Sequence, residues 1–263
     1  MVMIGRIAGA LCLALLVMGA TGAANGEAKR RANEGAKTES LKYQNCMALV
    51  QEKPEEAYRM ASTWGEEGGG RPARHCAAAA MIGMGMPAEA AQRLEDLARE
   101  KGLKKPGMRG NLLGQAASAW MIAGKPETAY ALQTRALKLR PRDVELLIDR
   151  SVSLASLKKW WEAIDDLNQA LDIDPGRTQA LVFRASAYRR LKQPELAADD
   201  IERALAIDPT HLDGLLESGN IRSEAGDRDS ARHDWMKIIK MAPWSPSAET
   251  ARRNLEKIDV KSR

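Results

Sequence analysis

The most regular feature of the chain is the spacing of its small and apolar residues between residues 110 and 243. Leucine recurs at a step of 34 residues, as Leu113, Leu147, Leu181 and Leu215, and alanine keeps the same step, as Ala129, Ala163, Ala197 and Ala231. Proline closes each interval, at Pro141, Pro175, Pro209 and Pro243. Proline ends a helix because it cannot continue the hydrogen-bond ladder. The pattern therefore predicts four repeated helical units, each of which ends at one of these prolines.

A third series of small residues keeps this step: Ala117, Ser151, Ala185 and Gly219. Small side chains at fixed places let paired helices pack closely, and an interval of 34 residues in helical hairpins resembles the tetratricopeptide repeat. The resemblance covers about residues 38–258. It implies an all-α fold, a right-handed α-solenoid of helix–turn–helix repeats with a C-terminal capping helix.

The resemblance also divides the chain. Two divergent repeats are expected at 38–105, four regular repeats at 110–243, and a capping helix with a tail at 244–263. In that last segment Ser245-Pro246 marks a helix start, and four residues form a narrow apolar stripe that would cover the end of the array: Ala248, Ala251, Leu255 and Ile258.

Residues 1–24 are predicted to be a signal peptide. Arg6 precedes an apolar run from Ile7 to Ala20, and small residues follow at Ala23 and Ala24, where cleavage fits the small-x-small rule. The run is shorter than the roughly 20 apolar residues that span a membrane. The alternative is an uncleaved anchor helix. Residues 25–37, which carry the densest basic run, are expected to be a disordered linker.

Two cysteines, Cys46 and Cys76, remain after removal of the signal, which takes Cys12 with it. An even number of cysteines in an exported chain predicts a disulfide, because the space outside the cytoplasm is oxidising. The alternative is a pair of buried free thiols. The repeat resemblance places both residues on neighbouring first helices, where a structural bridge is sterically plausible.

Composition and motifs indicate no catalytic chemistry. The net charge of +5 comes from mixed acidic and basic residues, and aromatic residues are only 4%, so a basic face with stacking aromatics is not visible. No zinc-protease, phosphate-loop or nucleophile-elbow motif occurs. The repeated pairs Asp165-Asp166 and Asp199-Asp200 are interpreted as a solvated convex face, and Trp160 and Trp161 as turn-packing residues. We therefore expect no enzyme activity, no metal and no cofactor.

The resemblance implies a groove lined by the first helix of each repeat, where tetratricopeptide-repeat proteins bind peptides. Carried over position by position, the predicted partner-binding residues are Ile148, Val152, Val182, Ser186, Arg189, Arg190, Leu216 and Asn220. The apolar members beside Arg189 and Arg190 would suit an extended or helical segment with acidic residues. For Ile148 and Val182 a purely supporting role in the core is equally compatible.

The sequence thus predicts a protein-binding scaffold of the bacterial cell envelope, periplasmic or secreted, whose partner is a protein or peptide and not nucleic acid. Two alternatives stay open. One is an enzyme whose site has no recognisable motif, and the other is a scaffold anchored by an uncleaved N-terminal helix.

Overall fold

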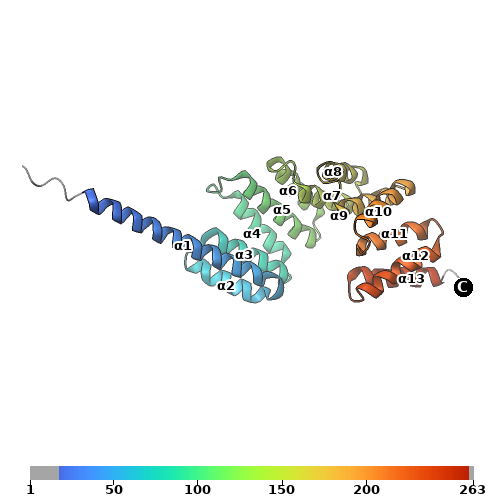
Figure 1. Cartoon of the computed structure of the whole chain (residues 1–263), viewed down its shortest axis with the longest axis horizontal. Coiled ribbons are helices and arrows are strands. Elements are labelled where there is room, and N and C mark those ends of the chain that lie inside the picture. Colours follow the sequence, from blue (N-terminus) through green and yellow to red (C-terminus); the bar gives the residue numbers. More distant parts are fainter. Residues whose placement is uncertain (1–17, 261–263) are drawn as a thin grey trace, which may run out of the picture. The chain divides into compact units, whose positions relative to one another are not determined.

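The computed structural model describes residues 18–260, and every regular element in that range is a helix (Figure 1). The helices fall into two compact units that divide between Gly83 and Met84. The first unit holds α1 (Met18–Glu52), α2 (Pro54–Glu66) and α3 (Gly70–Gly83). The second holds α4 (Pro87–Arg99), α5 (Pro106–Ile122), α6 (Pro126–Leu139), α7 (Val144–Ser156), α8 (Trp160–Ile173), α9 (Thr178–Arg190), α10 (Pro194–Ile207), α11 (Leu212–Glu224), α12 (Arg228–Met241) and α13 (Pro246–Val260).

Helix α1 occupies the segment that the sequence assigned to a disordered linker. Residues 25–37 are helical throughout, so that expectation is not what the structure shows. The segment has no proline and is rich in alanine, lysine, arginine and glutamate, which lose little conformational freedom in a helix. The predicted signal peptide lies mostly outside the described residues, and its last part, from Met18, begins α1. Within residues 18–260, none of the helices combines the length and apolar character of a membrane span.

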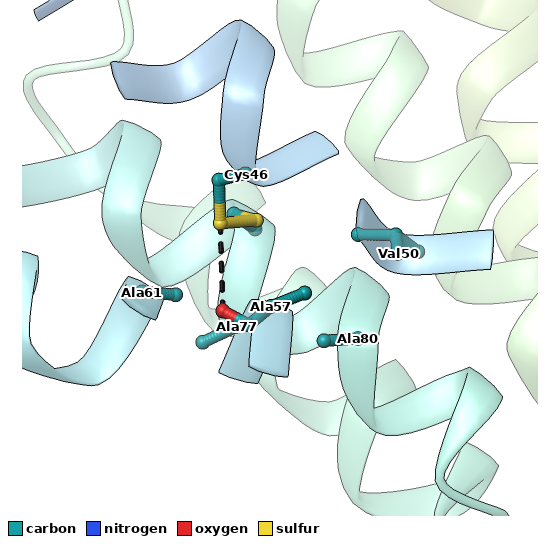
Figure 2. Close-up of a cluster of buried hydrophobic side chains, with 7 residues drawn as sticks. Cys46, Val50, Ala57, Ala61, Ala77 and Ala80 are labelled. Carbon is teal, nitrogen blue, oxygen red and sulfur yellow. Dashed lines mark hydrogen bonds between the residues drawn. A yellow bond between two sulfur atoms is a disulfide. The ribbon is translucent and has the colours of Figure 1, made fainter. Parts of the chain in front are cut away.

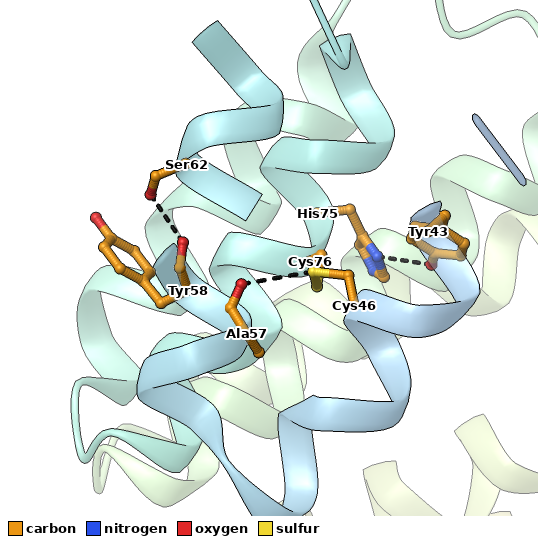
Figure 3. The surroundings of a disulfide bond; sticks show 7 residues. All are labelled: Tyr43, Cys46, Ala57, Tyr58, Ser62, His75 and Cys76. Atoms are coloured by element: carbon orange, nitrogen blue, oxygen red, sulfur yellow. Dashed lines mark hydrogen bonds between the residues drawn. A yellow bond between two sulfur atoms is a disulfide. The ribbon is translucent and has the colours of Figure 1, made fainter. Parts of the chain in front are cut away.

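A disulfide joins Cys46 on α1 to Cys76 on α3, as the sequence predicted (Figure 3). Their Cα atoms lie 6.3 Å apart, and both side chains are fully buried. Around them pack the small and branched side chains of α1, α2 and α3, which Figure 2 shows: Val50, Ala57, Ala61, Ala77 and Ala80. Because these neighbours are small, the three helices approach closely, and the bridge lies within their buried cluster.

The predicted interval is confirmed from α7 to α13, whereas α5 begins at Pro106, four residues before the predicted start at residue 110. Helices α7, α9 and α11 begin at residues 144, 178 and 212, and α8, α10 and α12 begin at 160, 194 and 228, so both series advance by 34 residues. Helix α13 begins at residue 246, one more step after α11. It therefore takes the place of the first helix of a fifth repeat, and its apolar stripe packs against α12 and α11.

Each hairpin turns through one residue in the left-handed backbone region. Gly124 and Gly226 stand there with φ of 71° and 91°, and Lys158 and Lys192 stand at the equivalent places with φ of 60° and 58°. The left-handed conformation costs a residue with a side chain about 1–2 kcal/mol. The turn geometry is therefore imposed by the packing of the flanking helices, and glycine is used in only two of these hairpins.

Buried ion pairs recur with the repeat, which corrects the interpretation of the acid pairs. Asp166 and Asp200 are 3% and 2% exposed. Arg150 binds Asp166 through Nε and Nη2 at 2.7 and 2.6 Å, and Arg184 binds Asp200 at the same two distances. Only the first aspartate of each pair, Asp165 and Asp199, is solvated.

The same arginines also connect successive hairpins. Arg150 Nη1 donates to Thr134 Oγ1 on α6, and Arg184 Nη1 donates to Asn168 Oδ1 on α8. The hydrogen bonds to the aspartates raise the pKa of both guanidinium groups. Each arginine therefore connects three helices. Its half-buried guanidinium charge is stabilised by two hydrogen bonds to one aspartate.

In the last regular hairpin, a glycine stands where the earlier hairpins have a small side chain. Gly219 occupies the place of Ala117, Ser151 and Ala185, and a Cβ atom there would lie 2.3 Å from Nε1 of Trp235. Trp235 itself stands where the earlier hairpins have Leu167 and Ile201, and it is 2% exposed. The larger aromatic ring thus requires the smaller partner.

Gly219→Ala is expected to lower the free energy of unfolding by about 1–2 kcal/mol, because overpacking outweighs the better helix propensity of alanine. Urea denaturation followed by circular dichroism measures the change. The double variant Gly219→Ala with Trp235→Leu restores the pairing of the earlier hairpins, so it should be more stable than Trp235→Leu alone. A neutral or stabilising Gly219→Ala in the wild-type background would contradict the close approach.

Candidate functional site

The first helices of successive hairpins form one continuous surface, here called the first-helix face. Helices α5, α7, α9, α11 and α13 lie in this order, each packed against the next. The predicted partner-binding residues come from α7, α9 and α11 of this series. The structure brings them to one face but gives them different environments.

Ile148 and Val182 are inside the core, with 2% and 4% of their surface exposed. Their burial therefore favours a supporting role in the core, which the sequence had left open beside a role in binding. Leu216 is half-buried and packs against the cluster at the C-terminal end of the array. None of these three apolar side chains is fully exposed on the first-helix face.

Val152 and Ser186 line a recess of about 310 Å³ between α7, α8 and α9. We call it the apolar recess; its walls are Ser151, Val152, Ala155, Ser156, Trp160, Ala163, Leu167, Phe183, Ser186 and Ala187. None of these side chains is charged, and two are aromatic. Trp160, expected only to pack at its turn, is part of the wall, whereas its neighbour Trp161 is 56% exposed, contrary to the expected packing.

Arg189 does not project freely from the face. Its Nε lies 2.5 Å from Oε1 of Glu217, and its Nη1 lies 2.5 Å from Oε1 of Glu224. Asn220 also donates to Glu217, at 3.1 Å. Burial lowers the pKa of Arg189, but the hydrogen bonds and charges of Glu217 and Glu224 raise it by more. The guanidinium is therefore satisfied within the chain, and its role in binding a partner stays a prediction.

Arg190 and Asn220 line a second recess, of about 430 Å³, near the C-terminal end of the same face. We call it the basic recess; its walls are Arg189, Arg190, Asn220, Ser223, Glu224, Arg228, Trp235, Thr250, Asn254, Lys257 and Ile258. Glu224 is paired with Arg189. Among the described residues, no ion pair is recorded for Arg190, Arg228 or Lys257.

The α13 residues of this recess were missed by the sequence analysis, which treated α13 only as a cap. Asn254 Nδ2 donates to Asn220 Oδ1 at 2.9 Å, across 34 residues. Thr250 likewise stands one step after Leu216, and Asn254 one step after Asn220. Continuing the same interval past Pro243 would have identified them, because α13 has the place of a first helix.

Buried polar groups between hairpins are matched to each other on the N-terminal part of the face. Ser153 Oγ lies 2.8 Å from Oε1 of Gln133, which is 1% exposed. Burial raises the pKa of Asp149, nearby Glu145 raises it further, and a hydrogen bond from Ser118 lowers it. These groups serve the contact between hairpins.

The described residues offer no metal-binding cluster of three His, Cys, Asp or Glu side chains. His75, beside the disulfide, lies with its Nδ1 2.9 Å from the hydroxyl of Tyr43 (Figure 3). The candidate site therefore consists of one apolar and one basic recess on the first-helix face.

Comparisons with known proteins agree with this architecture. The family model described as tetratricopeptide repeat matches residues 178–211, which contain α9 and α10. No curated protein sequence matches the chain.

Three solved structures illustrate the likeness in fold. PilF of Pseudomonas aeruginosa has a TM-score of 0.64 and 13% identity, over 83% of this chain and 98% of its own. MamA of Desulfovibrio magneticus RS-1 has a TM-score of 0.56 and 19% identity, over 67% and 97%. YrrB, described as a tetratricopeptide-repeat protein with an unusual peptide-binding site, has a TM-score of 0.53 and 22% identity, over 71% and 95%.

Sequence identities this low indicate a shared fold but do not indicate a shared ligand. The hairpins from α5 to α12 nevertheless repeat the arrangement of α9 and α10, the pair that the family model recognises. The helices from α5 to α12 therefore share the helical-repeat fold of these structures, and residues 178–211 match the tetratricopeptide-repeat model.

Proposed function

We propose that this protein is a scaffold that binds a segment of another protein on its first-helix face. The observation that carries the proposal is the apolar recess, an unfilled space of about 310 Å³ walled by Val152, Trp160 and Phe183. Recesses of this size on a pre-formed surface accept apolar side chains of a ligand. Among the structures of similar fold, YrrB has an unusual peptide-binding site and Cut9 forms a hetero-tetramer with Hcn1. Tetratricopeptide-repeat scaffolds are typically non-catalytic.

Site-specific photo-cross-linking tests this function. A benzophenone amino acid at Ser186, on the recess wall, should give discrete protein adducts in cells. The same group at Glu202, which is exposed on α10, should not. Adding Val152→Asp should abolish the Ser186 adducts, because a charge in an apolar recess is costly to desolvate. No adducts from Ser186, or equal adducts from both positions, would count against the proposal.

The proposal extends to the location of the scaffold, in the bacterial cell envelope after export. Supporting observations are the apolar run from Ile7 to Ala20 with small residues after it, and the buried Cys46–Cys76 bridge. Disulfides persist in oxidising compartments and are rare in the cytosol. Cleavage after Ala24 would leave α1 to begin at Asn25.

Mass spectrometry of the protein from cells decides between a soluble and an anchored scaffold. A mature chain shortened by about 24 residues, recovered without detergent, is expected. A full-length chain in the membrane fraction would instead support the alternative of an uncleaved anchor helix, and a full-length chain in the cytoplasm would reject export.

A further inference from the structure

The two recesses of the first-helix face are the same structural place, two repeats apart. Several residues that line the apolar recess have an equivalent 68 residues later, two steps of 34, that lines the basic recess. The equivalent pairs are Val152 and Asn220, Ala155 and Ser223, Ser156 and Glu224, Trp160 and Arg228, Leu167 and Trp235, and Ser186 and Asn254. The repeat therefore presents one recess shape twice, with different chemistry.

The equivalent place between them is occupied by the chain itself. One step of 34 from Ala155 and Phe183 leads to Arg189 and Glu217. These two side chains form the ion pair described above, at 2.5 Å, with 11% and 9% of their side-chain surfaces exposed. The middle position thus holds a paired charge, and its Arg189 also forms part of the wall of the basic recess.

The charge of the basic recess favours an anionic occupant. Its lining has the cations Arg190, Arg228 and Lys257, while Glu224 already pairs with Arg189. Asn220, Asn254 and Thr250 add amide and hydroxyl groups that can bind a carboxylate or a peptide backbone. Arginine in particular binds carboxylates through two parallel hydrogen bonds.

The spacing sets the length of the ligand. Packed helices lie about 8–10 Å apart, so α7 and α11 are separated by about 16–20 Å. An extended chain advances about 3.3 Å per residue, so about five or six residues span this distance.

From these observations we infer that the first-helix face recognises an extended partner segment with an apolar side chain and, about five or six residues away, one or two acidic side chains. The apolar side chain enters the apolar recess and the acidic side chains enter the basic recess. The segment crosses the Arg189–Glu217 pair between them. This inference rests on the proposed function and specifies the chemistry of its partner.

Selection from a random library tests the inference without knowledge of the natural partner. Twelve-residue peptides displayed on phage are selected on the purified chain, and binders are kept if they protect Ser186→Cys from alkylation. Aligned binders should share an aliphatic or aromatic residue and an Asp or Glu about five or six positions away. Protecting binders with no acidic preference would overturn the inference but leave the proposed function standing. No protecting binders at all would count against both.

Variants of each recess then establish that one ligand uses both. The dissociation constant of a selected peptide is measured by fluorescence anisotropy. It should rise about tenfold or more in the Val152→Asp variant, and by a similar factor in the separate Arg190→Glu, Lys257→Glu variant. Two matched controls on second helices, Leu196→Asp and Arg135→Glu with Lys138→Glu, carry the same charge changes at exposed places. They should change the constant by less than about twofold. A loss in only one recess variant, or equal losses in the controls, would reject a bipartite ligand.

A charge swap keeps the test independent of folding. The peptide whose acidic residues are replaced by lysine should bind the Arg190→Glu, Lys257→Glu variant at least about tenfold better than it binds the wild-type chain. Absence of this rescue would show that the carboxylates do not enter the basic recess.

Discussion

Asp166→Ala is expected to lower the free energy of unfolding by about 3–5 kcal/mol, because it leaves the guanidinium of Arg150 half-buried without its counter-charge. The Asp166 side chain is 4% exposed and accepts both hydrogen bonds from Arg150. The change also removes one of the connections between α7 and α8. Urea denaturation followed by circular dichroism measures the loss.

The adjacent Asp165 provides the matched control. It is exposed, and Asp165→Ala should change the free energy of unfolding by no more than about 0.5 kcal/mol. The first regular hairpin has the apolar residues Ala116 and Leu132 at the places of Arg150 and Asp166, and both are buried. Arg150→Ala with Asp166→Leu copies that pair and should retain wild-type stability within about 1 kcal/mol. Equal losses from Asp165→Ala and Asp166→Ala would contradict the buried ion pair.

Removal of the disulfide should have an effect of similar size, confined to the first unit. Closing a loop of 30 residues stabilises the folded state by about 3–4 kcal/mol in the chain-entropy model. Cys46→Ala with Cys76→Ala is therefore expected to speed amide exchange in α2 and α3 by a factor on the order of a hundred. Hydrogen exchange measured by mass spectrometry resolves these helices from the rest of the chain.

The double variant supplies its own control. Dithiothreitol should accelerate exchange in α2 and α3 of the wild-type chain and have no further effect on Cys46→Ala with Cys76→Ala. Exchange in α9 and α10 should be the same in all samples, because these helices belong to the second unit. Acceleration spread evenly over both units would show that the bridge does not act locally.

The repeats share the residues that pack their helices but differ in the residues that line the recesses. The small residues at 34-residue steps are nearly constant, whereas the recess walls change from Trp160 and Leu167 to Arg228 and Trp235 over two repeats. Packing of the hairpins therefore tolerates different wall chemistry, which leaves these positions available for selecting a ligand.

The sequence by itself determined the helices and their order from α7 to α13. Small side chains and prolines recur at one interval there, and both act on their immediate surroundings: a small residue permits a close helix contact, and a proline ends a helix. Their effect can therefore be predicted from spacing alone, and the starts of α7 to α13 follow it. The disulfide could also be predicted, because only one pairing is possible if the predicted signal peptide is removed together with Cys12.

Only the tertiary structure decided which side chains remain open to a partner. Asp165 and Asp166 are adjacent in sequence, yet one is solvated and the other is held by Arg150, 16 residues away. Arg189 is satisfied by Glu217, 28 residues away, whereas its neighbour Arg190 is exposed. Asn220 meets Asn254 only because α13 takes the place of a fifth first helix. Such outcomes depend on charges and volumes brought together from separate hairpins, and a periodic pattern records the hairpins but not which of their side chains pair.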